Sequence, residues 1–164
     1  MGNTCRSPMA EKIFNDLYKK SGMKGLKAVS AGLDCANGNN MELKAKRALK
    51  SIGFACGAKK TTRLETLEPN TLYITMTKQL KHALNKPSVL CFEDFGGNDI
   101  EDPYGGGQDV YDNCAKQILQ NVQLLIERLK KLSNWFQIQG LQSKKYSKWM
   151  LHSEHFLYSY TYFE

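Results

Sequence analysis

Short apolar runs alternate with longer stretches of helical spacing along the first 132 residues, and this alternation most constrains the fold. The expected strands are residues 26–31, 72–76 and 89–92, and the expected helices are residues 8–20, 42–52, 77–84 and 108–132, with a short helical turn at 64–69. Apolar residues at every third or fourth position are typical of a helix that packs on one face. Short β-compatible runs separated by helices predict an α/β fold with a parallel sheet.

Composition excludes several classes of protein. The 164 residues suffice for one domain with a sizeable core, and 41% hydrophobic with 24% charged residues is ordinary for a soluble globular protein. No apolar run is long enough for a membrane span, and the N-terminus lacks a basic-then-apolar signal pattern, so a cytoplasmic protein without a membrane partner is expected. Five scattered cysteines with no CxxC pair predict neither a disulfide framework nor a zinc site.

The net charge of +7 suits an anionic substrate or partner. A basic surface that is merely solvated remains the alternative interpretation. Nucleic-acid binding ranks low, because the chain shows no basic motif with interleaved aromatic residues.

The N-terminal loop is the strongest candidate for a ligand site. It begins at Gly2 and runs directly into a helix, with Ser7 as the expected N-cap and Pro8 in the first turn. The N–H groups of such a loop and of the helix start point into one concave site that favours anions. Arg6 adds a planar fork of donors that can bind two phosphate oxygens. The loop is therefore predicted to cradle a phosphate group.

This loop also carries a family resemblance. The unbroken run Gly2-Asn3-Thr4-Cys5-Arg6-Ser7-Pro8-Met9-Ala10-Glu11 resembles the phosphate loop of the low-molecular-weight protein tyrosine phosphatases. With Thr4 and the glycines 105–107, it looks most like the bacterial branch that includes protein-arginine phosphatases. Two further stretches agree, namely Ser30-Ala31-Gly32 at a strand end and Asp102-Pro103-Tyr104-Gly105 before the last helix.

The resemblance implies a fold, and it also implies a departure from the family. The expected fold is a doubly wound, four-stranded parallel sheet flanked by helices, formed by residues 1–132. The family loop reads Cys, five residues, Arg, Ser, which places the nucleophilic Cys immediately before Met1. Its apolar first strand, central in the sheet, is likewise expected to be missing from this chain. Loss of a central strand predicts a poorly stable protein.

The resemblance also assigns roles to residues. Arg6 would bind the phosphoryl oxygens, and Asp102 would be the general acid, held in place by Pro103. Ser7 would donate a hydrogen bond to the nucleophilic sulfur, and Asn3 would brace the loop. Tyr104 and Thr4 would line the substrate pocket. The loop N–H groups that would bind phosphate belong to Gly2, Asn3, Thr4 and Cys5. No metal or cofactor is implied.

Two of these assignments have alternatives. Asp102 is also compatible with a plain turn before a helix. Cys5 is either a thiol that forms a disulfide with the nucleophile or a passive loop residue. Its position next to Arg6 is too close for it to act as the nucleophile itself.

Three functions follow from the resemblance. The first is a protein phosphatase that hydrolyses phosphotyrosine or phosphoarginine through a cysteinyl-phosphate intermediate, with phosphate or vanadate as a ligand. The second is a catalytically dead relative that still binds phosphate. An arsenate reductase ranks lowest, because Cys91 has no second cysteine close by in the sequence to relay a disulfide.

Residues 133–164 fit no part of the family pattern and contain nine of the 17 aromatic residues. No helical period is evident in them. This C-terminal segment is interpreted as an extension of unknown role. It is an element packed on the domain, a product of a disrupted reading frame, or a tail that binds a partner.

Overall fold

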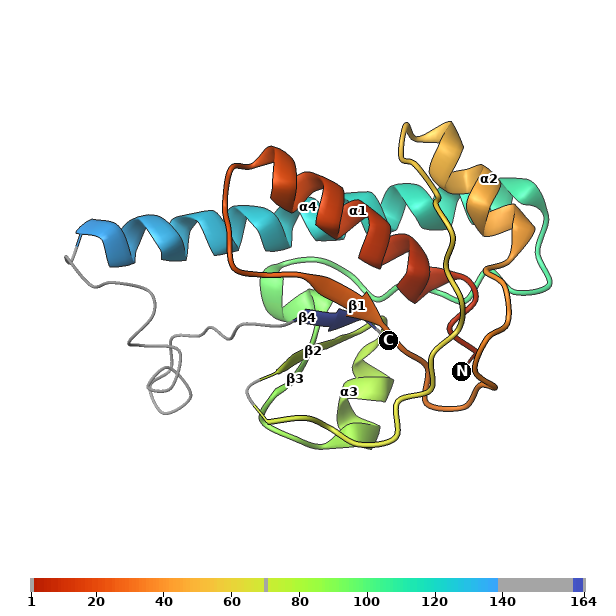
Figure 1. Ribbon diagram of the computed structural model, residues 1–164, viewed down its shortest axis with the longest axis horizontal. Helices are drawn as coiled ribbons and strands as arrows, with labels where there is room; N and C mark the ends of the chain where they lie inside the picture. The colour runs from red at the N-terminus through yellow and green to blue at the C-terminus, as the bar shows by residue number, and fades with distance from the viewer. Residues whose placement is uncertain (1, 70, 139–160, 164) are drawn as a thin grey trace.

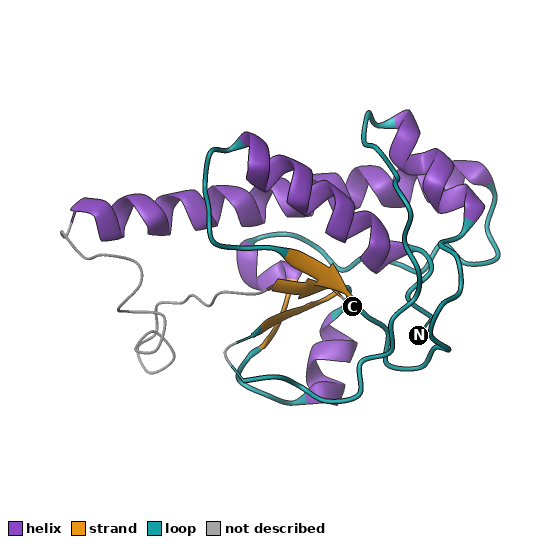
Figure 2. Ribbon diagram, viewed as in Figure 1, coloured by secondary structure: helices purple, strands orange, loops and turns teal. Residues whose placement is uncertain are grey.

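The computed structural model describes residues 2–69, 71–138 and 161–163, and it describes side chains for residues 2–69 and 71–135. Helices and strands alternate along the chain as expected (Figure 2). The elements are α1 (Arg6–Lys20), β1 (Ala28–Ser30), α2 (Leu43–Ser51), β2 (Leu72–Thr75), α3 (Lys78–Leu84), β3 (Val89–Cys91), the 3-10 helix η1 (Phe92–Phe95), α4 (Gln108–Ile138) and β4 (Thr161–Phe163). The α/β class with a parallel sheet is confirmed.

The sheet has the strand order β1-β4-β2-β3, and every neighbouring pair is parallel. The central position is occupied by β4, whose Tyr162 lies opposite Val29 on one side and Tyr73 on the other. The sequence predicted that a central strand would be missing, whereas the structure does not leave that position empty. An open gap would leave backbone donors and acceptors of β1 and β2 unpaired in the interior, which is costly. A strand from the C-terminal segment satisfies them.

Helices cover both faces of this sheet. Figure 1 shows α1, α2 and α4 on one side and α3 on the other. Helix α4 packs against α1 and α2, and α3 contacts β2 and β3. All four residues of β2 are buried, as expected for a parallel strand covered on both faces. The largest fully buried side chains include Met9, Ile13, Phe14, Leu49, Ile74, Phe92, Ile100, Tyr111, Ile118 and Leu125.

The start of α1 differs from the prediction at Ser7. The helix already begins at Arg6, its N-cap residue is Cys5, and no side chain caps it. Ser7 lies inside the first turn, where its hydroxyl accepts a hydrogen bond from Asn3 Nδ2 at 3.0 Å. The prediction of Ser7 as N-cap is therefore wrong.

Three other boundaries are informative. Thr77 stands at the predicted start of α3, and it caps the helix, since its hydroxyl accepts from Leu80 N at 3.3 Å. Residues 64–69 form no helix, and show only a bend at Thr66 and a turn at Pro69. The chain just before them is extended and bridges Gly32 to Arg63 instead. Helix α4 continues to Ile138, beyond the expected end near residue 132. Nothing in the described part of the chain is a helix both long and apolar enough to cross a membrane.

Candidate functional site

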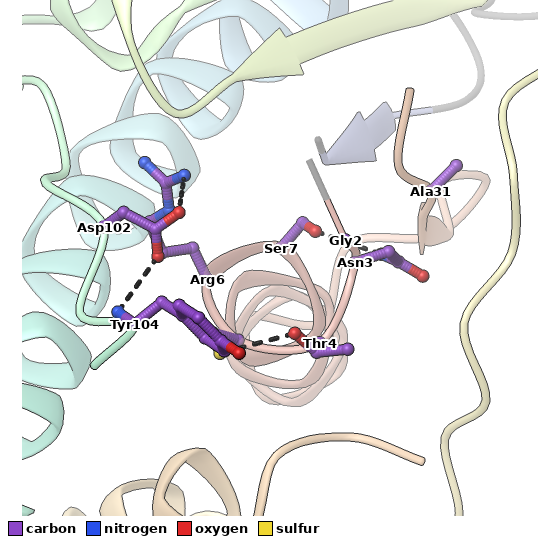
Figure 3. Close-up of a pocket in the computed structure, with 9 residues that line it drawn as sticks. Gly2, Asn3, Thr4, Arg6, Ser7, Ala31, Asp102 and Tyr104 are labelled. Carbon is purple, nitrogen blue, oxygen red and sulfur yellow. Dashed lines mark hydrogen bonds and ion pairs between the residues drawn. The ribbon is translucent and has the colours of Figure 1, made fainter. Parts of the chain in front are cut away.

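The predicted site residues meet around one cavity of about 350 Å³. Three segments form its wall: the loop before α1, the residue after β1 and the loop before α4 (Figure 3). The lining residues are Gly2, Asn3, Thr4, Cys5, Arg6, Ser7, Ala31, Asp102 and Tyr104. The structure therefore brings together the residues that the sequence assigned to catalysis, phosphate binding and the substrate pocket, although Asp102 lies 96 positions from Arg6 in the chain.

Asn3 fixes the shape of the N-terminal loop. Its backbone has a φ of 49°, in the left-handed region that asparagine tolerates better than most residues. Its buried side chain donates to Ser7 Oγ at 3.0 Å and accepts from Thr62 N at 3.0 Å. The Asn3 side chain thus ties the loop to the first turn of α1 and to the neighbouring segment at residue 62.

Arg6 is buried and forms an ion pair at the cavity. Its Nη2 donates to Asp102 Oδ2 at 2.8 Å, and its Nη1 donates to the carbonyl oxygen of Ile100 at 2.7 Å. The Asp102 side chain is 49% exposed, so its carboxylate faces solvent at the mouth. Its other oxygen, Oδ1, accepts from the backbone N–H of Tyr104 at 3.2 Å. A cation and a carboxylate are thereby held side by side at the cavity wall.

Cys5 points into the protein rather than across the loop. Its sulfur lies 3.6 Å from the Tyr111 hydroxyl and 3.5 Å from Thr4 Oγ1. Burial raises the pKa of the Cys5 thiol, so the thiol is protonated at neutral pH. Burial, together with the Cys5 thiol, also raises the pKa of Tyr111. Sequence reasoning missed Tyr111, which looked like one more apolar position on the stripe of α4.

A buried ion pair supports the wall of the cavity at β1. Glu11 Oε2 accepts from Ser30 N, Ser30 Oγ and Lys59 Nζ, each at 2.8 Å. Burial opposes ionisation of this carboxyl, yet the hydrogen bonds from Lys59 and Ser30 prevail and lower the pKa of Glu11. Lys59 also donates to the carbonyl oxygen of Ser30 at 3.2 Å. These contacts fix the end of β1 and hence the position of Ala31 at the cavity.

The sequence did not single out the pair of Glu11 and Lys59. The only signal for Lys59 was the small and basic character of residues 54–62, and nothing local connects it to α1.

This arrangement suits an anion. The N–H groups at the helix start carry positive partial charge, and Arg6 adds a full charge. Within the described residues no group of three or more His, Cys, Asp or Glu side chains is placed to hold a metal ion. The chemistry that the cavity offers is therefore anion binding next to a carboxyl group that can transfer a proton.

Comparisons with known proteins agree with this geometry. Residues 1–134 match the profile of the "Low molecular weight phosphotyrosine protein phosphatase" family. A protein-arginine-phosphatase of Bacillus subtilis is 28% identical over 141 residues, covering 79% of this chain and 93% of that protein.

Two solved structures are also similar. A low molecular weight protein tyrosine phosphatase from T. tengcongensis has 33% identity and a TM-score of 0.70, covering 78% of this chain and 94% of its own. The YwlE arginine phosphatase from Geobacillus stearothermophilus has 28% identity and a TM-score of 0.68, covering 80% and 89%.

Proposed function

We propose that this chain, which belongs to the low-molecular-weight phosphotyrosine protein phosphatase family, serves to remove phosphoryl groups from phosphoarginine or phosphotyrosine side chains of proteins. Members of this family are phosphoric monoester hydrolases. The observation that carries the proposal is the contact between Arg6 and Asp102 at one cavity, which sets a proton-transferring carboxyl beside an anion site.

In the proposed mechanism the loop binds the phosphoryl group. The backbone N–H groups of residues 2–5 and the Arg6 guanidinium donate to its equatorial oxygens and stabilise the charge of the transition state. Asn3 holds the loop in shape through its two hydrogen bonds. Because Ser7 Oγ accepts from Asn3, its own proton is available for a hydrogen bond to the attacking sulfur.

The attacking thiolate belongs, by the family pattern, to a Cys immediately N-terminal to Met1. Its sulfur bonds to phosphorus while the bond from phosphorus to the leaving oxygen or nitrogen breaks. Asp102 gives that leaving atom a proton. Asp102 then takes a proton from a water molecule that attacks the cysteinyl phosphate, which releases phosphate and regenerates the thiolate. Cys5 does not fit this role, because its thiol is buried against Tyr111 and its pKa is raised.

Addition of a single residue tests the mechanism. A Cys inserted before Met1 should confer hydrolysis of an aryl phosphate that thiol alkylation abolishes, whereas a Ser inserted at the same position should not. Within the Cys-extended chain, Asp102→Asn removes the proton donor and Arg6→Lys removes the guanidinium that binds two phosphoryl oxygens. Each change should lower kcat by about 10²-fold or more. Turnover by the Ser-extended chain at the rate of the Cys-extended chain would exclude this assignment.

A phosphate-binding protein without turnover is the second candidate. It is favoured by the cavity itself, in which Cys5 is the only thiol among the described lining residues and is unsuited to attack. Titration of the 164-residue chain with phosphate and vanadate measures this binding directly. Tight binding of both, with no hydrolysis by the Cys-extended chain, would favour this second function.

Thr4 and Tyr104 are the proposed determinants of substrate choice. Thr4 lines the cavity as part of the loop, and Tyr104 is 78% exposed at the mouth, where its ring can contact a planar guanidinium or phenol. The similarity to relatives named as protein-arginine-phosphatases favours phosphoarginine as the substrate of this chain. Thr4→Ile in the Cys-extended chain should shift the ratio of phosphoarginine to phosphotyrosine turnover, and Thr4→Ser is the control that keeps the hydroxyl. An unchanged ratio in Thr4→Ile would refute the role of Thr4.

A further inference from the structure

The start of helix α2 contacts both of the loops that carry the charged groups of the cavity. The backbone N–H of Glu42 donates to Thr4 O, in the loop before α1, at 2.9 Å. Two residues later, Lys44 Nζ donates to Gly106 O, in the loop before α4, at 2.7 Å. Figure 1 shows α2 beside the start of α4, and the two helices are in contact. One short stretch of chain thus connects the two sides of the site.

Lys44 is held in place by further contacts with α4. Its half-buried side chain lies over the ring of Tyr111, with Nζ 5.8 Å from the ring centroid. Its carbonyl oxygen accepts from Gln108 Nε2 at 3.0 Å, and the same Nε2 donates to Asp112 Oδ1 at 2.9 Å. A free lysine side chain has many rotamers, and these contacts restrict them. The position of the ammonium group is therefore determined by α4 as well as by α2.

The loop before α4 has a backbone that is intrinsically permissive. Residues 105–107 are all glycines, which adopt more backbone conformations than any other residue. Within the loop, Gly106 N donates to Pro103 O at 2.9 Å and closes a turn. Lys44 binds the carbonyl oxygen of the same Gly106. An anchor at this glycine also restrains the turn, which begins directly after Asp102.

We propose that Lys44 is a positioning residue, which holds the loop before α4 in place and keeps the Asp102 carboxylate beside Arg6. The carboxylate accepts one hydrogen bond at each oxygen, from Arg6 Nη2 and from Tyr104 N (Figure 3). Its side chain is 49% exposed, so water competes for both bonds. Without the bond from Lys44, movement of the loop carries the carboxylate away from the cavity wall.

The consequence for catalysis rests on the proposed function, in which Asp102 is the general acid. A proton donor has to lie within hydrogen-bond reach of the leaving atom, and a misplacement of about 1 Å can cost about 10²-fold in rate. Lys44 itself touches no reacting group in this mechanism. It acts through the position of Asp102.

The first experiment measures the loop in the 164-residue chain. Lys44→Met removes the ammonium group, and Lys50→Met makes the same change at an exposed position of the same helix, as the matched control. NMR order parameters of the backbone N–H groups of residues 104–107 should fall from about 0.85 to below about 0.6 in Lys44→Met. They should be unchanged in Lys50→Met. Lys44→Arg keeps a long cationic donor and should remain close to the wild type.

The second experiment measures proton transfer in the Cys-extended chain. Phenyl phosphate needs a proton on its leaving oxygen, whereas p-nitrophenyl phosphate has a leaving group that is stable as an anion. Lys44→Met should lower kcat/KM for phenyl phosphate by about 10-fold or more, and for p-nitrophenyl phosphate much less. A purely structural loss would lower both values by the same factor, because it only reduces the amount of folded enzyme. Lys50→Met should leave both values unchanged.

Two results would overturn the proposal. Equal order parameters in Lys44→Met and Lys50→Met would show that the bond does not restrain the loop. An equal fall of kcat/KM for the two phosphates would show that Lys44 does not act on proton transfer. If Lys44→Met does not fold, Lys44→Gln, which has a shorter side chain, is measured by the same criteria. If the Cys-extended chain hydrolyses neither phosphate, the proposed function fails, and the order parameters alone decide whether Lys44 holds the loop.

Discussion

Removal of the Lys59 ammonium by Lys59→Met should be among the most destabilising single changes outside the apolar core. It leaves the Glu11 carboxylate, whose side chain is only 9% exposed, with its bonds to Ser30 but without its closest cation. Breaking a buried ion pair on one side costs about 3–5 kcal/mol. For a chain of this size that corresponds to a fall in Tm of about 6–20 °C at neutral pH.

The contribution of Glu11 to stability should depend on pH in opposite directions in the wild type and in Lys59→Met. In the wild type the pKa of Glu11 is held below its ordinary value of 4.5, so its stabilising contribution is present above that pH and is lost as the pH falls through the folded-state pKa. Without Lys59, burial prevails and should raise the pKa of Glu11 above its unfolded value. The folded variant then favours the protonated carboxyl, and its deficit in Tm should shrink as the pH is lowered toward about 4.5.

Thermal unfolding followed by circular dichroism over this pH range is the assay. Lys12→Met is the matched control, since Lys12 Nζ lies 3.5 Å from Glu11 Oε1, is more exposed, and should contribute about 0–1 kcal/mol. The double change Glu11→Gln with Lys59→Met should recover part of the loss, because no charge remains buried. A Tm of Lys59→Met equal to that of Lys12→Met at every pH would refute the reasoning.

Three further changes test the packing around the site. Gly97→Ala would place a Cβ atom 2.6 Å from Asn121 Oδ1, so it should cost about 1–3 kcal/mol in denaturant unfolding, and an unchanged midpoint would contradict this close contact. Burial raises the pKa of Cys114 to about 12, so iodoacetamide should label the half-buried Cys56 well before Cys114, as read by peptide mass spectrometry; the reverse order would contradict the burial. Asn3→Ala and Asn3→Gly both lose two side-chain hydrogen bonds, but Ala should cost about 1 kcal/mol more because φ is 49°, and equal stabilities would argue against that strain.

The sequence was sufficient to predict a feature wherever the residues that determine it lie close together in the chain. The period of α4, the start of α3 at Thr77 and the continuous run from Gly2 to Glu11 could all be predicted, because each depends on residues within a few positions of one another. Residues 64–69 were wrongly predicted as a helical turn, since the bridge between Gly32 and Arg63 holds the preceding chain extended.

The parts that were missed depend on contacts between distant segments. Lys59 reaches Glu11 across 48 positions of the chain, and Tyr111 reaches Cys5 across 106. For a lysine in a polar loop and a tyrosine on the apolar stripe of a helix, the neighbouring sequence does not indicate such distant partners. Strand β4 is the clearest case, because three residues of β-propensity acquire a place in the sheet only through β1 and β2.

The position of β4 also determines the order in which this protein can fold. The sheet closes at its centre only when residue 161 pairs with residues 28 and 72, which are separated from it by most of the chain. Contacts so distant in sequence slow folding, because the entropy of the intervening loop is lost before the contact stabilises the protein. During synthesis the helices and the β2–β3 pair precede β4, and the sheet is completed only after residue 163 has been translated.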